Sequence, residues 1–183
     1  MGKVFDGIDP KLATFLTAQP IFFVASAPSG EGGHVNLSPK GYDSFRILKP
    51  HTVAYLDFVG SGVETIAHLR QNGRLTLMFC AFEGPPRIVR LYGRGKVVGP
   101  SDDEFGTLSS HFGAGDGIRS VIVATLDRVA DSCGYGVPLM AYQGQRPQMK
   151  AWFDHKGPAG LENYLAEHHL SVDGLPGLTP DRG

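Results

Sequence analysis

The sequence predicts a mainly β fold, an antiparallel β-barrel with flanking helices. Its 183 residues include 25 glycines and 13 prolines, which are spread along the chain. This spread indicates many turns and therefore many short strands. Neighbouring strands joined by short turns favour antiparallel pairing, and closure into a barrel removes exposed sheet edges. A β-sandwich satisfies the same pattern and stays an alternative.

Hydrophobic periodicity gives the order of the elements as a helix, three strands, a helix, two strands, a helix, a strand and a helical tail. The strands are expected at 21–26, 34–37, 51–58, 74–81, 87–98 and 120–128. Glycines at alternate positions of the fifth strand, Gly93 and Gly95, mark a barrel bend or a close approach of backbones.

Four helices are expected around these strands. Asp9 suits an N-cap, and Pro10 the first position of a helix that runs to Ala18. The other helices are expected at 61–72, 101–111 and 146–169. Capping boxes begin the second and third helices, and Gly73 ends the second. Residues 173–183 are expected to be loose.

The sequence indicates the domain organisation, and its composition argues against two classes of protein. We expect a barrel domain over 1–145 and a helical extension over 146–183, packed on the barrel or on a dimer partner. A net charge of −1 and a pI near 6.6 argue against nucleic-acid binding, which needs a clustered positive field. No apolar run reaches the length of about 18 residues that a membrane span needs.

The N-terminus and the cysteines indicate the compartment. Residues 1–6 lack the apolar core of a signal peptide, so we expect a cytoplasmic location. The two cysteines are too few for a disulfide framework, and Cys80, inside an apolar run, is expected to be a buried thiol.

The first candidate for an anion site is a polar row at the end of a strand. In extended backbone His34, Asn36, Ser38 and Lys40 project on one face. A phosphate group needs a cation and small hydrogen-bond donors, and Lys40 with Ser38 provides both. A solvated hairpin end is the structural alternative.

The second candidate is the turn Gly60-Ser61-Gly62 at the start of a helix. Free backbone N–H groups and the helix dipole favour an anion there, and glycine allows a close approach. Ser61 and Glu64 have capping-box spacing, in which the Glu64 carboxylate competes for the same donors. A plain helix cap is the structural alternative.

The third candidate is the basic face of the long strand 87–98. Arg87 and Arg90 lie near its start, and Arg94 and Lys96 follow. Basic residues on a strand also occur on solvated faces, which is the alternative here. Their combination with the two preceding candidates favours a phosphate-bearing ligand.

Together these features resemble the pyridoxamine 5′-phosphate oxidase-like family of FMN-binding split barrels. The resemblance covers 21–98 and rests on three stretches: HVNLSPKG at 34–41, YLDFVGSG at 55–62 with the helix that follows, and RIVRLYG at 87–93. It implies an antiparallel, Greek-key-like split barrel that forms a homodimer with the flavin between the subunits. It also implies that the second chain completes the site, with the segment around Trp152 as a candidate.

The resemblance implies which residues hold the cofactor. Lys40 and Ser38 would lie near the flavin phosphate, the strand at 55–57 would pass the ring and ribityl chain, and the helix start would contact the phosphate. The implied set is Asn36, Leu37, Ser38, Lys40, Tyr55, Leu56, Asp57, Ser61, Gly62, Thr65, Arg87 and Arg90.

Two departures bear on function. Ile88 stands where the family has Gln between its two arginines, so one polar contact to the flavin ring is absent. The oxidase also has a C-terminal Arg-x-His-Asp-Arg sequence that grips pyridoxal phosphate, and nothing like it follows Trp152. Oxidation of vitamin B6 is therefore not expected.

The preferred hypothesis is an FMN-dependent oxidoreductase that acts on a small-molecule substrate or electron donor. A deazaflavin, F420, is an alternative cofactor, since its acidic tail suits Arg94 and Lys96. A flavin- or haem-binding protein without turnover is the third possibility. Candidate proton donors are His34, Tyr55 and Tyr92, and no metal site is expected.

Overall fold

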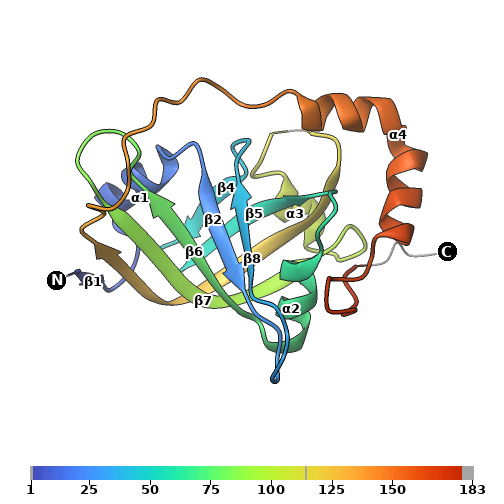
Figure 1. Ribbon diagram of the computed structural model, residues 1–183, viewed down its shortest axis with the longest axis horizontal. Helices are drawn as coiled ribbons and strands as arrows, with labels where there is room; N and C mark the ends of the chain where they lie inside the picture. The colour runs from blue at the N-terminus through green and yellow to red at the C-terminus, as the bar shows by residue number, and fades with distance from the viewer. Residues whose placement is uncertain (1, 114, 179–183) are drawn as a thin grey trace.

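The computed structural model describes residues 2–113 and 115–178, whose strands form one eight-stranded antiparallel sheet (Figure 1). The strands are β1 (Val4–Phe5), β2 (Phe22–Ser26), β3 (Asn36–Lys40), β4 (Phe45–Lys49), β5 (Thr52–Phe58), β6 (Arg74–Cys80), β7 (Ile88–Val98) and β8 (Ile118–Ser132). The helices are α1 (Pro10–Thr17), α2 (Glu64–Asn72), α3 (Phe105–Ser109) and α4 (Gln148–Glu167).

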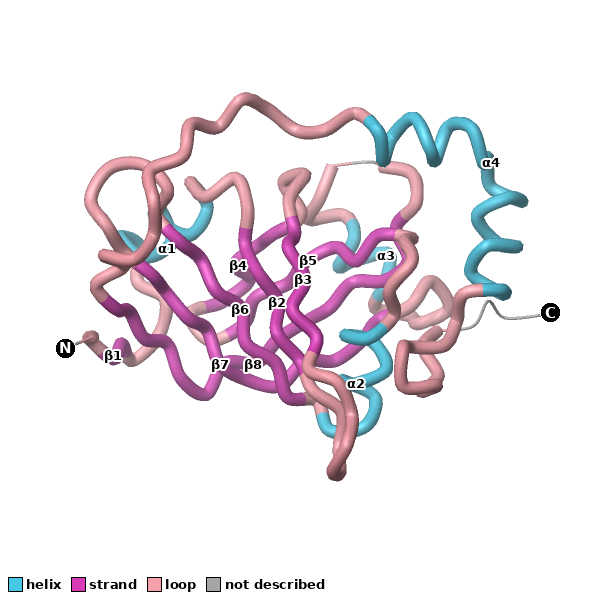
Figure 2. The backbone as a smooth tube through the Cα atoms, in the orientation of Figure 1, coloured by secondary structure: helices cyan, strands magenta, loops and turns pink. Residues whose placement is uncertain are grey.

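The strand order is β3-β2-β6-β7-β8-β5-β4, with β1 paired to β8. The consecutive strands β6, β7 and β8 together with β5 beside β8 make a Greek key. The sheet curls until side chains of its distant strands meet in the interior. The ring centroids of Phe22 in β2 and Phe45 in β4 are 5.5 Å apart. The mainly β, antiparallel barrel is confirmed (Figure 2).

The barrel is closed on itself by side chains rather than by a last ladder of hydrogen bonds. Within the described residues, β3 and β4 are the two ends of the strand order and do not pair with each other. We call this opening between β3 and β4 the seam. Side chains that reach across the seam therefore help to decide how the two ends of the sheet are held.

The sequence predicted most elements and missed two strands. β1 has two residues, too few for a pattern, and β4 (FRILK) mixes two cations with its apolar residues. The strand predicted at 34–37 lies at Asn36–Lys40 instead and contains Pro39, which an edge strand tolerates. α1 is confirmed with its cap, since the Asp9 carboxylate accepts the N–H of Leu12 at 2.7 Å.

The core fills the barrel and takes in both N-terminal helices. Four aromatic rings pack at its centre: Phe22, Phe45, Tyr55 and Phe79. Leu12 and Leu16 of α1 and Ile66 and Leu69 of α2 join the same cluster. Cys80 is buried, as predicted. The fold is therefore a filled barrel, and a ligand must bind at its surface or between subunits.

Outside the barrel, α3 covers a second apolar cluster on β5, β7 and β8. An extended segment at 133–147 then crosses the molecule to α4 (Figures 1 and 2). α4 bends at Gly157, which precedes Pro158, and its Phe153 packs against Gly117. Among residues 2–113 and 115–178, no helix combines the length and apolar composition that a membrane crossing requires. The domain boundary at 145/146 stays a prediction.

The expectation that the tail from 173 onward is loose was wrong for residues 173–178. Asp173 pairs with His34 at 2.6 Å, and Arg70 donates a hydrogen bond to the carbonyl of Gly177. Leu178 packs against the barrel core. Prolines and glycines here shape a turn that tertiary contacts fix. Residues 179–183 lie outside the described residues.

The close backbone approach predicted at Gly93 is present and is testable. A Cβ at this position would lie 2.1 Å from the carbonyl oxygen of Thr125, at a bulge in the β7–β8 ladder. We expect Gly93→Ala to lower the free energy of unfolding by about 1–3 kcal/mol, because the backbones must separate. Denaturant unfolding measures this change.

Gly106→Ala is the control, since Gly106 lies in α3 with nothing within 4 Å of its added Cβ. There the lost flexibility of glycine should raise the free energy of unfolding by about 0.5–1 kcal/mol. Equal effects of the two substitutions would contradict the close approach at Gly93.

Candidate anion-binding site

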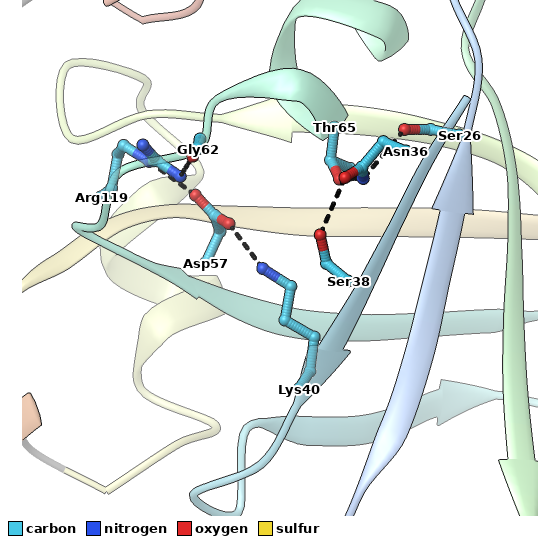
Figure 3. A network of polar contacts seen from close by, with 8 residues as sticks. All are labelled: Ser26, Asn36, Ser38, Lys40, Asp57, Gly62, Thr65 and Arg119. Carbon is cyan, nitrogen blue, oxygen red and sulfur yellow. Dashed lines mark hydrogen bonds and ion pairs between the residues drawn. The ribbon is translucent and has the colours of Figure 1, made fainter. Parts of the chain in front are cut away.

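A buried carboxylate with two cations lies where β3, β5 and β8 meet (Figure 3). Lys40 Nζ lies 3.1 Å from Asp57 Oδ1, and Arg119 Nε donates to Asp57 Oδ2 at 2.7 Å. The side chains of Asp57 and Arg119 are 2% and 4% exposed. Since β3 and β5 lie on opposite sides of the seam, the Lys40–Asp57 ion pair ties the two ends of the sheet together.

A β-bulge directs Arg119 toward this carboxylate. Asp57 pairs with Ser120 and Phe58 with Ile118, so Arg119 is the extra residue of β8 between the two pairs. Arg119 and Ser120 are consequently both buried, where a regular strand would send them to opposite faces. Arg119 also donates from its NH2 group to the carbonyl of Gly62 at 2.7 Å, and its NH1 group has no partner among the described residues.

Lys40, Arg119 and Asp57 together carry a net charge of +1, which the Glu64 carboxylate beside Gly62 offsets in part. Lys40 has three N–H donors, and among the described residues it uses one on Asp57, so two remain. A buried positive charge that is not fully neutralised is stabilised by an anion. The cluster therefore fits an anionic group better than a neutral or cationic one.

A second polar network adjoins the cluster through β3. The side-chain amide of Asn36 donates to Thr65 Oγ1 at 3.0 Å, and its oxygen accepts from Ser38 Oγ at 3.0 Å. Figure 3 shows Ser38 and Lys40 projecting from the same side of β3 toward α2 and β5. The polar row predicted by strand parity is confirmed for Asn36, Ser38 and Lys40, which are partly buried, while Leu37 faces out and is 61% exposed.

The start of α2 differs from the prediction. The helix begins at Glu64, and no side chain caps it, so the expected Ser61–Glu64 capping box is wrong. Its Glu64 carboxylate accepts the N–H of Val172 at 3.3 Å instead. Just before the helix, the Gly62 carbonyl accepts a hydrogen bond from Arg119. Ser61 therefore does not accept hydrogen bonds from the backbone N–H groups in the first turn of α2. At the other end, Gly73 ends the helix as predicted.

Beneath these residues lies a buried histidine. His68 of α2 is fully buried, with Nδ1 2.9 Å from Ser26 Oγ and Nε2 without a partner among the described residues. Burial lowers the pKa of His68 below its usual 6.5, although the carboxylates of Asp173 and Glu64 act in the opposite direction. His68 is therefore neutral in the folded protein near neutral pH. Its contact with Ser26 links α2 to β2.

The remaining residues of β5 lie inside apolar clusters. Tyr55 is fully buried among the core rings, and burial raises its pKa well above 10.0. Its hydroxyl has no hydrogen-bond partner among the described residues. Leu56 lies in the outer cluster under α3. The Tyr55 ring nevertheless borders the candidate site, since Lys40 Nζ lies 5.9 Å from its centroid. The raised pKa leaves the Tyr55 hydroxyl a poor proton donor.

Arg87, which precedes β7, and Arg90 of β7 do not contact this cluster within one chain. Arg87 pairs with Asp131 at 2.9 Å, and Arg90 donates to Ser132 Oγ at 3.1 Å. Arg90 pairs in register with Ala130 of β8, ten residues along the strand from Ser120, the partner of Asp57. Within one chain, Arg87 and Arg90 thus make their polar contacts with the end of β8 and not with the Lys40–Asp57–Arg119 cluster.

Sequence reasoning missed Arg119 and His68. The strand was expected to begin at Ser120, which left Arg119 in a turn. A usable signal was present: Asp57 and Arg119 are charged residues of opposite sign beside or within apolar strands, and such charges are buried only when paired. No group of three or more His, Cys, Asp or Glu side chains suited to a metal ion occurs in 2–113 or 115–178.

Comparison with known proteins identifies relatives of the whole chain. Residues 8–133 match the family model described as pyridoxamine 5′-phosphate oxidase. The chain is 38% identical over 192 residues to the pyridoxamine 5′-phosphate oxidase family protein ustO of Aspergillus flavus. That match covers 95% of this chain and 77% of ustO.

Solved structures share the fold at low sequence identity. HupZ of Group A Streptococcus superposes with a TM-score of 0.53 at 17% identity, over 73% of this chain and 99% of HupZ. A Lactobacillus delbrueckii protein named after pyridoxamine 5′-phosphate oxidase gives 0.53 at 15% identity, over 69% and 98% of the two chains. These likenesses show that the barrel is the split barrel of this family.

Neutral, buried His68 predicts a loss of stability in acid. The unfolded chain takes up a proton near pH 6.5, while the folded chain resists it, so the free energy of unfolding falls as the pH drops below about 6.5. We expect His68→Gln to flatten this dependence, measured by denaturant unfolding between pH 7.5 and 5, values chosen to bracket about 6.5.

The matched control is His155→Gln, because His155 is an exposed histidine of α4. This variant should keep the pH dependence of the wild type. If His68→Gln and the wild type lose stability with the same slope, His68 is not the group responsible.

Proposed function

The chain belongs to the pyridoxamine 5′-phosphate oxidase family, and on that premise we propose that it is an FMN-dependent oxidoreductase. The observation that carries the proposal is the Lys40–Asp57–Arg119 cluster beside the uncapped start of α2. A net positive charge, a lysine with two unused N–H donors and free backbone donors together suit a phosphate monoester.

The residues present fit the phosphate of FMN. Thr65 Oγ1 accepts from Asn36, which leaves its own hydroxyl hydrogen free to donate to a ligand. Arg119 NH1 is buried and has no partner among the described residues, so Arg119 acts on this region through its contacts with Asp57 and Gly62. Ser38 donates to Asn36 Oδ1 in this arrangement, so its contact with a phosphate requires rotation of the hydroxyl. Lys40 and Thr65 are thus the side chains best placed to bind.

Bound FMN supplies hydride and electron transfer at its ring, while the chain binds and orients it. We propose a small-molecule substrate or electron donor, and we do not extend the proposal to vitamin B6 oxidation, because the C-terminal phosphate-binding sequence of the oxidase is absent after Trp152. FMN is preferred to F420 because Arg94 donates to the Asn72 carbonyl and Lys96 pairs with Glu104, so neither is free for an acidic tail.

We further propose that the active form is a homodimer in the cytoplasm. Val35 and Leu37 are 75% and 61% exposed beside the polar row of β3, and a partner subunit would remove these apolar side chains from water. A second chain would also supply Arg87 and Arg90, which do not contact Lys40 within one chain. The two cysteines, Cys80 and Cys133, are free, which suits a reducing compartment.

FMN binding is testable by colour and by titration. Purified protein should take up FMN and show flavin absorption at about 370 and 450 nm. Lys40→Gln should weaken FMN binding by about 1.5–3 kcal/mol, or about 10- to 150-fold in Kd, because it removes a charge-assisted hydrogen bond.

Lys49→Gln, an exposed lysine of β4, is the control and should bind FMN as the wild type does. A protein that stays colourless after incubation with FMN contradicts the proposed function. Equal Kd values for Lys40→Gln and Lys49→Gln would remove Lys40 from the site.

The homodimer is testable by sedimentation velocity of the FMN-loaded protein. We expect a dimer, and we expect Leu37→Glu to shift the species toward monomer while it weakens FMN binding, because it places a charge in the proposed apolar interface. A wild-type monomer that retains FMN would overturn this part of the proposal.

A further inference from the structure

We propose that Arg119 is a positioning residue of the phosphate site: one buried guanidinium fixes Lys40 through Asp57 and fixes the start of α2 through the Gly62 carbonyl. This inference rests on the proposed function. It assigns a role to a residue that lies outside the stretches by which the chain resembles its family, and it gives Asp57 an indirect role in binding.

The two hydrogen bonds of Arg119 leave its side chain little freedom. The guanidinium is planar, and its Nε–H and NH2 groups point in fixed directions, toward Asp57 Oδ2 and the Gly62 carbonyl, both at 2.7 Å. Its position is also set by the backbone, since Arg119 is the extra residue of a β-bulge. Arg119 therefore connects β5, β8 and the turn before α2 as one rigid group.

Asp57 transmits this constraint to Lys40. One carboxylate oxygen accepts from Arg119 and the other faces Lys40 Nζ at 3.1 Å. With both oxygens occupied and 2% of its side chain exposed, Asp57 has no favourable contact to offer an anionic ligand. Its effect on binding is to hold the lysine ammonium in place, at the end of a flexible stem that would otherwise sample many rotamers.

The bond to Gly62 orients the donors of α2. In a trans peptide the carbonyl and the following N–H point in opposite directions, so the Gly62 carbonyl held by Arg119 fixes the direction of the Val63 N–H. Val63 is the N-cap position of α2 and carries no side-chain cap. Arg119 thus fixes both the turn before α2 and, through Asp57, the cation of Lys40, although these come from distant parts of the sequence.

Riboflavin separates the phosphate site from the rest of the flavin, because it is FMN without the phosphate. The experiment titrates apoprotein with FMN and with riboflavin and takes the ratio of the two Kd values. We expect the wild type to prefer FMN by at least about tenfold, and Arg119→Gln to lose about tenfold or more of that preference at unchanged riboflavin affinity. Arg119→Lys should fall between them, since one ammonium cannot span both acceptors.

Arg128→Gln is the matched control, an exposed arginine of the same strand, and should keep the wild-type ratio. Thermal unfolding of each variant reports folding. Because Arg119→Gln leaves the buried Asp57 with only Lys40, the double variant Asp57→Asn with Arg119→Gln keeps the test possible if the single variant does not fold. Its ratio should equal that of the single variant, since both residues act through one cluster.

The outcomes separate the two proposals. A wild type that binds FMN no more tightly than riboflavin overturns the phosphate site, and the role of Arg119 with it. A wild type that prefers FMN, with the same preference in folded Arg119→Gln or in the folded double variant, overturns the role of Arg119 alone.

Discussion

The buried carboxylate of Asp57 is the interaction on which the candidate site depends. A carboxylate removed from water costs several kcal/mol unless cations and hydrogen bonds compensate it. Asp57 obtains this compensation from Lys40 on one side and Arg119 on the other. The strands β3 and β8 must therefore hold their cations close to β5, which fixes the geometry of the surrounding surface.

The same ion pair has a structural consequence at the seam of the barrel. Because β3 and β4 do not pair among the described residues, Lys40–Asp57 and the packing of Phe22 on Phe45 are contacts that join the two ends of the sheet. An isolated buried ion pair is weak evidence for stability, since an apolar replacement often stabilises as well. The second cation of the Lys40–Asp57–Arg119 cluster is explained by the binding of an anionic ligand. Departures from an apolar core are expected at functional sites.

The polar groups around the cluster divide between support and binding. His68, Ser26 and Asn36 form a chain of contacts beneath β3 and orient its side chains. Lys40, Thr65 and the first turn of α2 retain donors for a ligand. The C-terminal turn around Asp173 lies against the same helix and contacts Glu64 through Val172. These contacts explain how a segment expected to be loose becomes part of the surroundings of the site.

The sequence by itself determined what local physics controls. Alternating apolar residues defined the main strands, Asp9 and Pro10 the start of α1, Gly73 the end of α2, and strand parity the polar row of Asn36, Ser38 and Lys40. The family resemblance supplied the split barrel and the candidate ligand. Only the tertiary structure showed that Arg119 joins this row, that Ser61 does not cap α2, and that Arg87 and Arg90 lie elsewhere. The reason is that a bulge, a ladder register and an ion pair across the seam each depend on residues far apart in the chain, so no local pattern specifies them.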